Sequence, residues 1–328
     1  MVTSYVIRDR KLLAADPEES QVFVYASPSA DEKQHLLDTY RLDAHTLESA
    51  LDPDEIARIE FRSELVFIIW KRPKNYSFEK QLIFGVTSVG IIFQSNRLVF
   101  ITNEEAVEFG GKSFRESETI QDVLLRFLVQ TVHHYLGHLK AIKLISAEIQ
   151  AKINTSMENI YLLHMFELGE SLTYYLDAIE GNATVLAKLR GGVERTCFQK
   201  EDTFRLDDII IDNQQCSKQA QIYSSVLSGL MDARGNIINN NVNVLLRNLT
   251  LINVVFLPLN LIAGILGMSE FSMMTTGTDW RITYSLFGAA MIALGWGTWK
   301  LVRKISGPQE AKEKVKKRWR LRQLRRDK

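Results

Sequence analysis

The chain has few of the residues and motifs that mark extracellular proteins or enzymes. Its 328 residues include only two cysteines, Cys197 and Cys216, which are too few for a disulfide framework and are expected to be reduced. The first five residues do not resemble a signal peptide, which favours a cytoplasmic N-terminus. No phosphate-binding glycine loop, H-E-x-x-H or G-x-S-x-G motif is present, so we expect neither an enzyme nor a bound cofactor, nor coupling to ATP.

Proline is also scarce, and its distribution predicts long helices. There are six prolines, and none lies between residues 117 and 258. Over 119–153, apolar residues recur every three or four positions, as in an amphipathic helix. A second helix is expected from 157 to about 190, ending at Gly191-Gly192. A third begins near Leu206 and, if unbroken from Asp208 to Met268, is far longer than an average helix.

The first hundred residues predict a mixed α/β domain. Short segments rich in β-branched and aromatic residues are expected as strands of one sheet, at 21–25, 65–71, 81–89, 90–94 and 97–102. Between the first two, helical spacing with Asp and Pro start signals predicts helices at 31–41 and 44–51 and in the stretch 52–59. Gly110-Gly111 marks a domain boundary.

Two segments near the end lack charge altogether. Residues 248–268 give 21 uncharged residues and 282–299 give 18, each about long enough for a ~30 Å hydrocarbon core. Trp280, Trp296 and Trp299 lie near the span ends, as interfacial anchors do. We therefore expect two transmembrane helices.

The charges outside the spans predict the orientation. From Lys300 to Lys328, thirteen Lys and Arg against three acids give a net charge of +10, while the turn 269–281 has a net charge of −1. The positive-inside rule then places both termini in the cytoplasm of an inner or plasma membrane protein. The tail could also contact anionic lipids, with Trp319 as an anchor, and no nucleic-acid role is expected.

The predicted organisation has six parts, combined in an α+β membrane protein. They are a cytosolic α/β domain (1–115), a helical domain with a stalk helix (116–247), a first span (248–268), an external loop (269–281), a second span (282–299) and a basic tail (300–328).

Polar residues recur along one face of the third helix and its span. The series has separations of 7, 4, 3, 3, 4, 4, 3 and 4 residues and alternates polar with leucine positions. Its members are Asp232, Asn239, Asn243, Leu246, Leu249, Asn253, Leu257, Asn260 and Gly264. Polar groups in a span are costly unless they face water or partners, so this stripe predicts a pore lining, although an interhelical hydrogen bond explains Asn253 equally well. Neutral oxygens suit a hydrated cation such as Mg²⁺, and leucine rings can gate by dewetting.

The sequence from Asn243 to Thr250, followed by PLNLIAGILGM at 258–268, resembles the signature of the CorA superfamily of divalent-cation transporters and channels. The resemblance implies a homopentamer in which the first span lines the pore and the second packs outside it. It also implies that Gly267, Met268, Ser269 and Glu270 form the outer entrance.

The signature departs from the family pattern at its last residue. The family has Gly-Met-Asn, and this chain has Gly-Met-Ser at 267–269. The transported ion therefore stays open among Mg²⁺, Co²⁺, Ni²⁺ and Zn²⁺. A zinc-selective ZntB-like transporter and a nonconducting membrane scaffold or sensor are the alternatives.

Family members also bind Mg²⁺ between cytosolic domains and close when it is abundant. Asp207, Asp208 and Asp212 are the candidate regulatory ligands, although acids near a helix start are equally explained by the helix dipole. His134 and His138 have a spacing that can hold Zn²⁺, but a two-histidine pair without a third ligand is usually structural.

Overall fold

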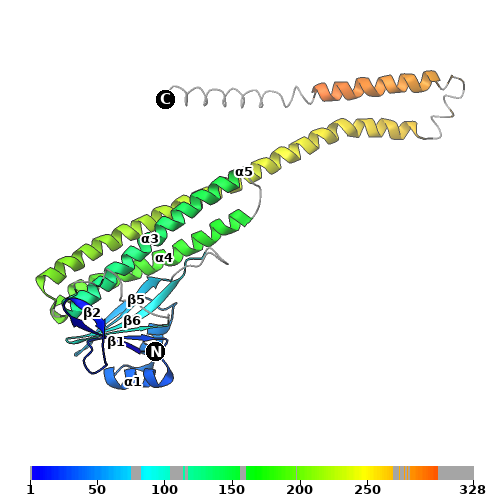
Figure 1. The fold of residues 1–328 in the computed structure, drawn as a ribbon. Helices are drawn as coiled ribbons and strands as arrows, with labels where there is room; N and C mark the ends of the chain where they lie inside the picture. The colour runs from blue at the N-terminus through cyan, green and yellow to red at the C-terminus, as the bar shows by residue number, and fades with distance from the viewer. Residues whose placement is uncertain are drawn as a thin grey trace, which may run out of the picture. The chain divides into compact units, whose positions relative to one another are not determined.

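A computed structural model describes residues 2–74, 83–103, 114, 117–155, 160–196, 198–268, 273, 277, 279 and 281–301. These residues belong to two compact units, Met1–Asp232 and Ala233–Lys328 (Figure 1). The long helix α5 (Lys200–Leu266) contributes to both of them.

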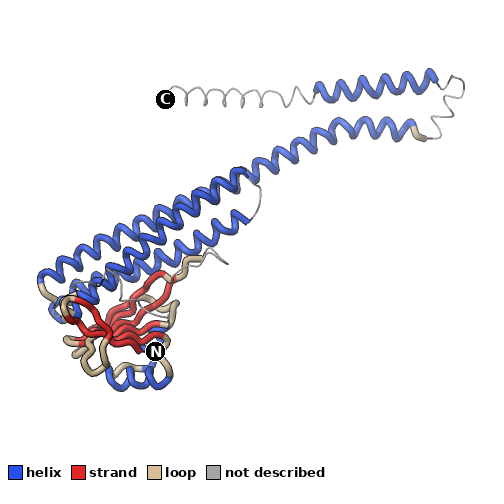
Figure 2. The backbone as a smooth tube through the Cα atoms, viewed as in Figure 1, coloured by secondary structure: helices blue, strands red, loops and turns tan. Residues whose placement is uncertain are grey.

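The first unit is built on a seven-stranded sheet (Figure 2). Its strands are β1 (Val2–Arg8), β2 (Lys11–Ala14), β3 (Val22–Ala26), β4 (Arg58–Phe61), β5 (Val66–Pro73), β6 (Val86–Gln94) and β7 (Arg97–Thr102). The spatial order is β2-β1-β3-β7-β6-β5-β4, in which only β3 and β7 are parallel. The predicted mixed α/β domain is thus confirmed, although the sequence reading missed β1, β2 and β4.

The two faces of the sheet bury separate cores, because successive strand residues point to opposite sides. On β5, Phe67 and Ile69 join a core with the short helices α1 (Ala30–Tyr40) and α2 (Ala44–Leu51). Ile68 and Trp70 join the larger core formed with the long helices. The continuous apolar run of β5 therefore reflects burial on both faces.

Local capping explains where the short helices begin. Ser29 accepts from the backbone N–H of Glu32, whose carboxylate accepts from the Ser29 N–H, forming a capping box at α1. Asp43 caps α2 by a single bond, in which its Oδ1 accepts from the backbone N–H of Thr46. The helix expected over 52–59 was wrong: Asp52 ends α2, the chain turns at Pro53, and β4 begins at Arg58.

The two strands expected at 81–89 and 90–94 are one strand where the structure describes them, from Val86 to Gln94. Gly90 does not break it. A Cβ at Gly90 would lie only 2.6 Å from the Cβ of Ala50, so the missing side chain lets α2 pack closely on the sheet. The expected division into two strands at residue 90 was wrong, because a glycine that is required for close packing resembles a strand end in the sequence.

Three long helices complete the first unit. They are α3 (Ile120–Thr155), α4 (Ile160–Gly191) and the part of α5 before Ala233, and a short 3-10 turn, η2 (Val193–Arg195), connects α4 to α5. The predicted long helices and the break at Gly191-Gly192 are confirmed. The Gly110-Gly111 pair lies outside the described residues.

The second unit contains the end of α5 and a further helix over 281–301. By length and composition, α5 is the one described helix able to cross a membrane, and none of its apolar window is buried. The second predicted span falls within the helix 281–301 and stays a prediction as a membrane crossing.

Candidate ion pathway

The candidate pathway rests on α5, a helix of 67 residues that is continuous through Pro258. Proline has no N–H to donate to the carbonyl four residues earlier, which is tolerated in a helix that has neighbours. The helix ends at the signature, where the N–H of Gly267 donates to Ala263 O at 3.0 Å and that of Met268 to Ile265 O at 3.3 Å.

All members of the predicted stripe lie on this helix, and their side chains are exposed in the single chain. Leu246, Leu249 and Leu257 are 53%, 50% and 74% exposed. The apolar stretch of α5 has no fully buried residue, and its exposed leucines alternate with exposed asparagines. Such a large apolar surface is unfavourable in water. This face is therefore suited to contact with lipid or with another chain.

The opposite face of α5 is already covered. Within the second unit, the half-buried residues of the span are Leu251, Val255, Pro258, Leu259 and Ile262. At about 100° per residue, they lie on the side of the helix away from the stripe centred on Asn253 and Asn260.

The helix 281–301 provides the cover. Its half-buried residues also share one face, and a Cβ at Gly295 would lie 3.8 Å from Cδ1 of Leu259. A small residue at this point allows the two helices to approach closely, as is usual between membrane helices. The sequence reading did not identify this covered face, although glycine at 295 was the available signal.

The predicted entrance is described only in part. Gly267 and Met268 are exposed at the end of the last turn of α5. Ser269, Glu270 and the basic tail beyond residue 301 lie outside the described residues.

The three candidate regulatory aspartates do not come together in one chain. Asp207 accepts from Arg190 at 2.6 Å and 3.2 Å, so its carboxylate is neutralised by an ion pair between α5 and α4. Among the described residues, no group of three or more His, Cys, Asp or Glu side chains is placed to hold a metal ion. Asp207 is thus explained by the ion pair.

Asp208 and Asp212 instead line a surface cavity of about 490 Å³ between α3 and α5. Gln130 and His133 of α3 lie across the cavity, and Arg205 pairs with Asp122 beside it. Asp208 is exposed and Asp212 is half-buried, so a divalent ion at this place would take its other ligands from water or from another copy of the chain.

His138 is buried in the core, and the half-buried His134 lies beside it. His138 is 5% exposed, its Nδ1 lies 2.5 Å from the Tyr175 hydroxyl, and its ring meets that of His134 edge to face at 4.4 Å. Burial, and then the neighbouring His134, lower the pKa of His138 to about 4. Packing therefore accounts for the pair. Burial likewise raises the pKa of Cys216 to about 12, so that thiol is a packing group.

Comparison with known proteins gives a consistent result. Residues 21–304 match the family described as CorA-like Mg²⁺ transporter protein. The chain is 24% identical over 251 residues to the cobalt/magnesium transport protein CorA of Methanocaldococcus jannaschii, an alignment that covers 74% of this chain and 77% of that protein.

Two solved structures are similar in fold. The complete CorA magnesium transporter of M. jannaschii superimposes with a TM-score of 0.72 at 19% identity, covering 94% of this chain and 98% of that one. The ZntB cytoplasmic domain of Vibrio parahaemolyticus gives a TM-score of 0.57 at 8% identity, covering 73% and 98%. With the family match spanning most of the sequence, the chain belongs to the CorA-like Mg²⁺ transporter family.

Proposed function

We propose that five copies of this chain form a membrane pore that carries divalent metal cations, with Mg²⁺, Co²⁺, Ni²⁺ and Zn²⁺ as candidates. The observation that carries this proposal is the two-sided character of α5. Between Leu251 and Ile262, the helix 281–301 covers one side of α5, and Asn253, Leu257 and Asn260 on the other side are exposed. A ring of identical copies would turn that stripe toward a shared axis.

The cytosolic part of α5 supports the same assembly. Phe204, Ile211 and Ile222 are 68%, 52% and 58% exposed. A repeat of seven that starts at Phe204 passes through Ile211 and later meets Asp232, Asn239, Leu246, Asn253 and Asn260. Phe204, Ile211 and these stripe residues therefore share one heptad phase, with Lys218 and Ser225 at the positions between them, whereas Ile222 lies four positions later in the heptad.

This shared phase has a geometric consequence. A straight α-helix drifts by about 20° per heptad, so one heptad phase faces one axis throughout only if the copies wind around each other in a left-handed sense. We propose such a supercoiled bundle of α5 helices along the axis, with the helix 281–301 outside it.

The chemistry of the stripe suits a hydrated ion. Mg²⁺ gives up its water reluctantly, and rings of amide oxygen can bind its water shell by hydrogen bonds. Asn260 and Asn253 would supply such rings, while the leucine rings at 246, 249 and 257 would gate by dewetting. Gly267, Met268, Ser269 and Glu270 would form the entrance, and Asp208 and Asp212 would respond to internal divalent cations.

The proposed topology follows from charge. The basic tail and the first unit would lie in the cytoplasm, and only the short loop 269–281 would face outward. In this arrangement the tail is next to the membrane surface, where it would contact anionic lipid headgroups.

Cation entry into proteoliposomes tests the proposal. The wild type should admit Mg²⁺ or a transition-metal dication, and Asn260→Leu should reduce entry by about tenfold or more, since an apolar ring replaces a hydrated one. Asn248→Leu is the matched control, because this exposed asparagine lies on the same helix away from the stripe. Equal entry through Asn260→Leu and Asn248→Leu would remove Asn260 from the pathway.

The assembly is measured separately by light scattering of the detergent-solubilised protein. A monomer or dimer would contradict the pore. A pentamer that admits no cation would favour the nonconducting scaffold or sensor, and strong preference for Zn²⁺ over Mg²⁺ would favour the ZntB-like alternative.

A further inference from the structure

A cavity of about 660 Å³ opens where three turns of the first unit meet. Residues 61–66 of the β4–β5 connection, residues 93–95 at the end of β6, and Arg195 and Thr196 after α4 line it. This volume lies within the ~300–1,000 Å³ range of small-molecule sites. None of these residues belongs to the proposed ion pathway.

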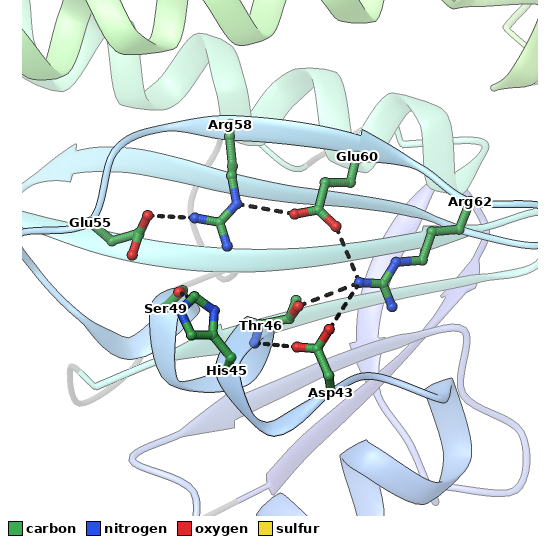
Figure 3. A network of polar contacts seen from close by, with 8 residues as sticks. All are labelled: Asp43, His45, Thr46, Ser49, Glu55, Arg58, Glu60 and Arg62. Carbon is green, nitrogen blue, oxygen red and sulfur yellow. Dashed lines mark hydrogen bonds and ion pairs between the residues drawn. The ribbon is translucent and has the colours of Figure 1, made fainter.

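One of the two arginines in the lining is neutralised within the fold. Arg62 Nη2 lies 3.1 Å from Glu60 Oε2 and 3.8 Å from Asp43 Oδ2, and it donates to Thr46 at 3.4 Å (Figure 3). Arg58 continues this network on the other side of Glu60 (Figure 3). Arg62 therefore has a structural role at the cavity wall.

Arg195 is placed differently. Its guanidinium lies over the ring of Phe61, 5.7 Å from the centroid, and it has no ion pair within the described part of the chain. Gly192 makes this placement possible, because a Cβ there would lie 2.4 Å from Cζ of Phe61. The turn η2 thus packs against the ring of Phe61, and the guanidinium of Arg195, which has no ion pair among the described residues, lines the cavity.

Further hydrogen-bonding groups surround this cation. Ser63 and Ser95 line the cavity, and across the described residues their hydroxyls make no hydrogen bond within the protein. A guanidinium with nearby hydroxyl donors is a suitable arrangement for the oxygens of a phosphate or carboxylate. Glu64 also lines the cavity without an ion pair among the described residues, and its charge opposes an anion.

We propose that this cavity binds a small organic anion through a phosphate or carboxylate group held by Arg195, with Ser63 and Ser95 as additional donors. The volume exceeds that of the oxyanion alone, so the ligand carries a small organic body. The site stands independently of the ion pathway, and its test does not depend on cation transport.

Equilibrium dialysis of the full chain in lipid nanodiscs, with AMP, succinate and inorganic phosphate as probes, measures the binding. We expect saturable binding of AMP or succinate that Arg195→Gln weakens by about tenfold or more, since a charge-assisted contact is lost. Glu64→Gln should tighten the same binding several-fold, because it removes a like charge. Lys188→Gln, at an exposed lysine of α4 outside the lining, should leave it unchanged.

The opposite directions of the two cavity variants separate ligand binding from a general loss of structure. Arg195→Lys keeps the charge and the contact with Phe61, so it should bind the anion more tightly than Arg195→Gln. If Arg195→Gln folds poorly, Arg195→Lys is the second variant that tests the charge. Preference for AMP over succinate would identify a phosphate as the bound group, and the reverse a carboxylate. Absence of saturable binding, binding of inorganic phosphate alone, or equal affinities of Arg195→Gln and Lys188→Gln would overturn the proposal.

Discussion

Asn182 connects α4 to the sheet by a pair of hydrogen bonds, and its removal should destabilise the first unit strongly. Its Oδ1 accepts from the Lys71 backbone N–H at 3.0 Å, and its Nδ2 donates to the Lys71 carbonyl at 2.7 Å. The pairing of β4 with β5 ends where Arg58 lies opposite Ile69. On that side of β5, the side-chain amide of Asn182 therefore takes the place of a strand partner for Lys71. Asn182 itself is 0% exposed.

Asn182→Ala leaves two buried backbone groups without partners. Each such group costs about 1–3 kcal/mol, so the free energy of unfolding should fall by about 2–6 kcal/mol. For a unit of this size, a loss of about 3 kcal/mol lowers Tm by roughly 6–12 °C. Thermal unfolding of the detergent-solubilised chain, followed by circular dichroism, measures this change.

Thr184→Ala is the control for this prediction. Thr184 is exposed on the same helix and its hydroxyl bonds only to the Glu180 carbonyl, at 3.3 Å. Its replacement should change the free energy of unfolding by no more than about 0.5 kcal/mol. If the two variants unfolded at the same temperature, the Asn182 amide would not be the tie between α4 and β5.

Three further predictions concern the spans, the core and the entrance. Gly295→Leu should push the helix 281–301 away from Leu259 and lower the stability of the assembly by about 1–3 kcal/mol, whereas Gly297→Leu, at a glycine with open space, should be tolerated in the same unfolding assay. Because the pKa of His138 is lowered from its ordinary value of 6.5 to about 4 in the folded chain, the unfolded state binds more protons between these two pH values, and stability should fall as pH drops from about 6.5 toward about 4. His138→Gln should reduce this slope, and an unchanged slope would contradict the assignment. Ser269→Asn should increase Mg²⁺ entry relative to Zn²⁺ or Co²⁺ in proteoliposomes, because a longer carboxamide can reach the hydrated ion, and unchanged entry and preference would show that this position does not set selectivity.

Several features of the chain could be predicted from the sequence because they depend on local composition. The absence of proline and the periodicity over 119–153 indicated α3, and β-branched runs indicated β3, β5 and β7. The edge strands β2 and β4, and β1 beside β2, were missed because their short segments carry charged or polar residues that resemble turns. The helical spacing over 52–59 was misleading because the segment is short, and so few residues cannot distinguish a helix from a turn followed by a strand.

The proposed ion pathway combines features that linear patterns predict with others that depend on packing. The uncharged lengths of the two spans, the spacing of the stripe residues and the family signature are properties of the linear chain, so they could be recognised without a structure. Packing in three dimensions places the helix 281–301 over the other side of α5, pairs Asp207 with Arg190, and directs Arg195 to a cavity. These outcomes depend on side chains from distant segments meeting across packed elements, and hydropathy and periodicity carry no information about which partner each one meets.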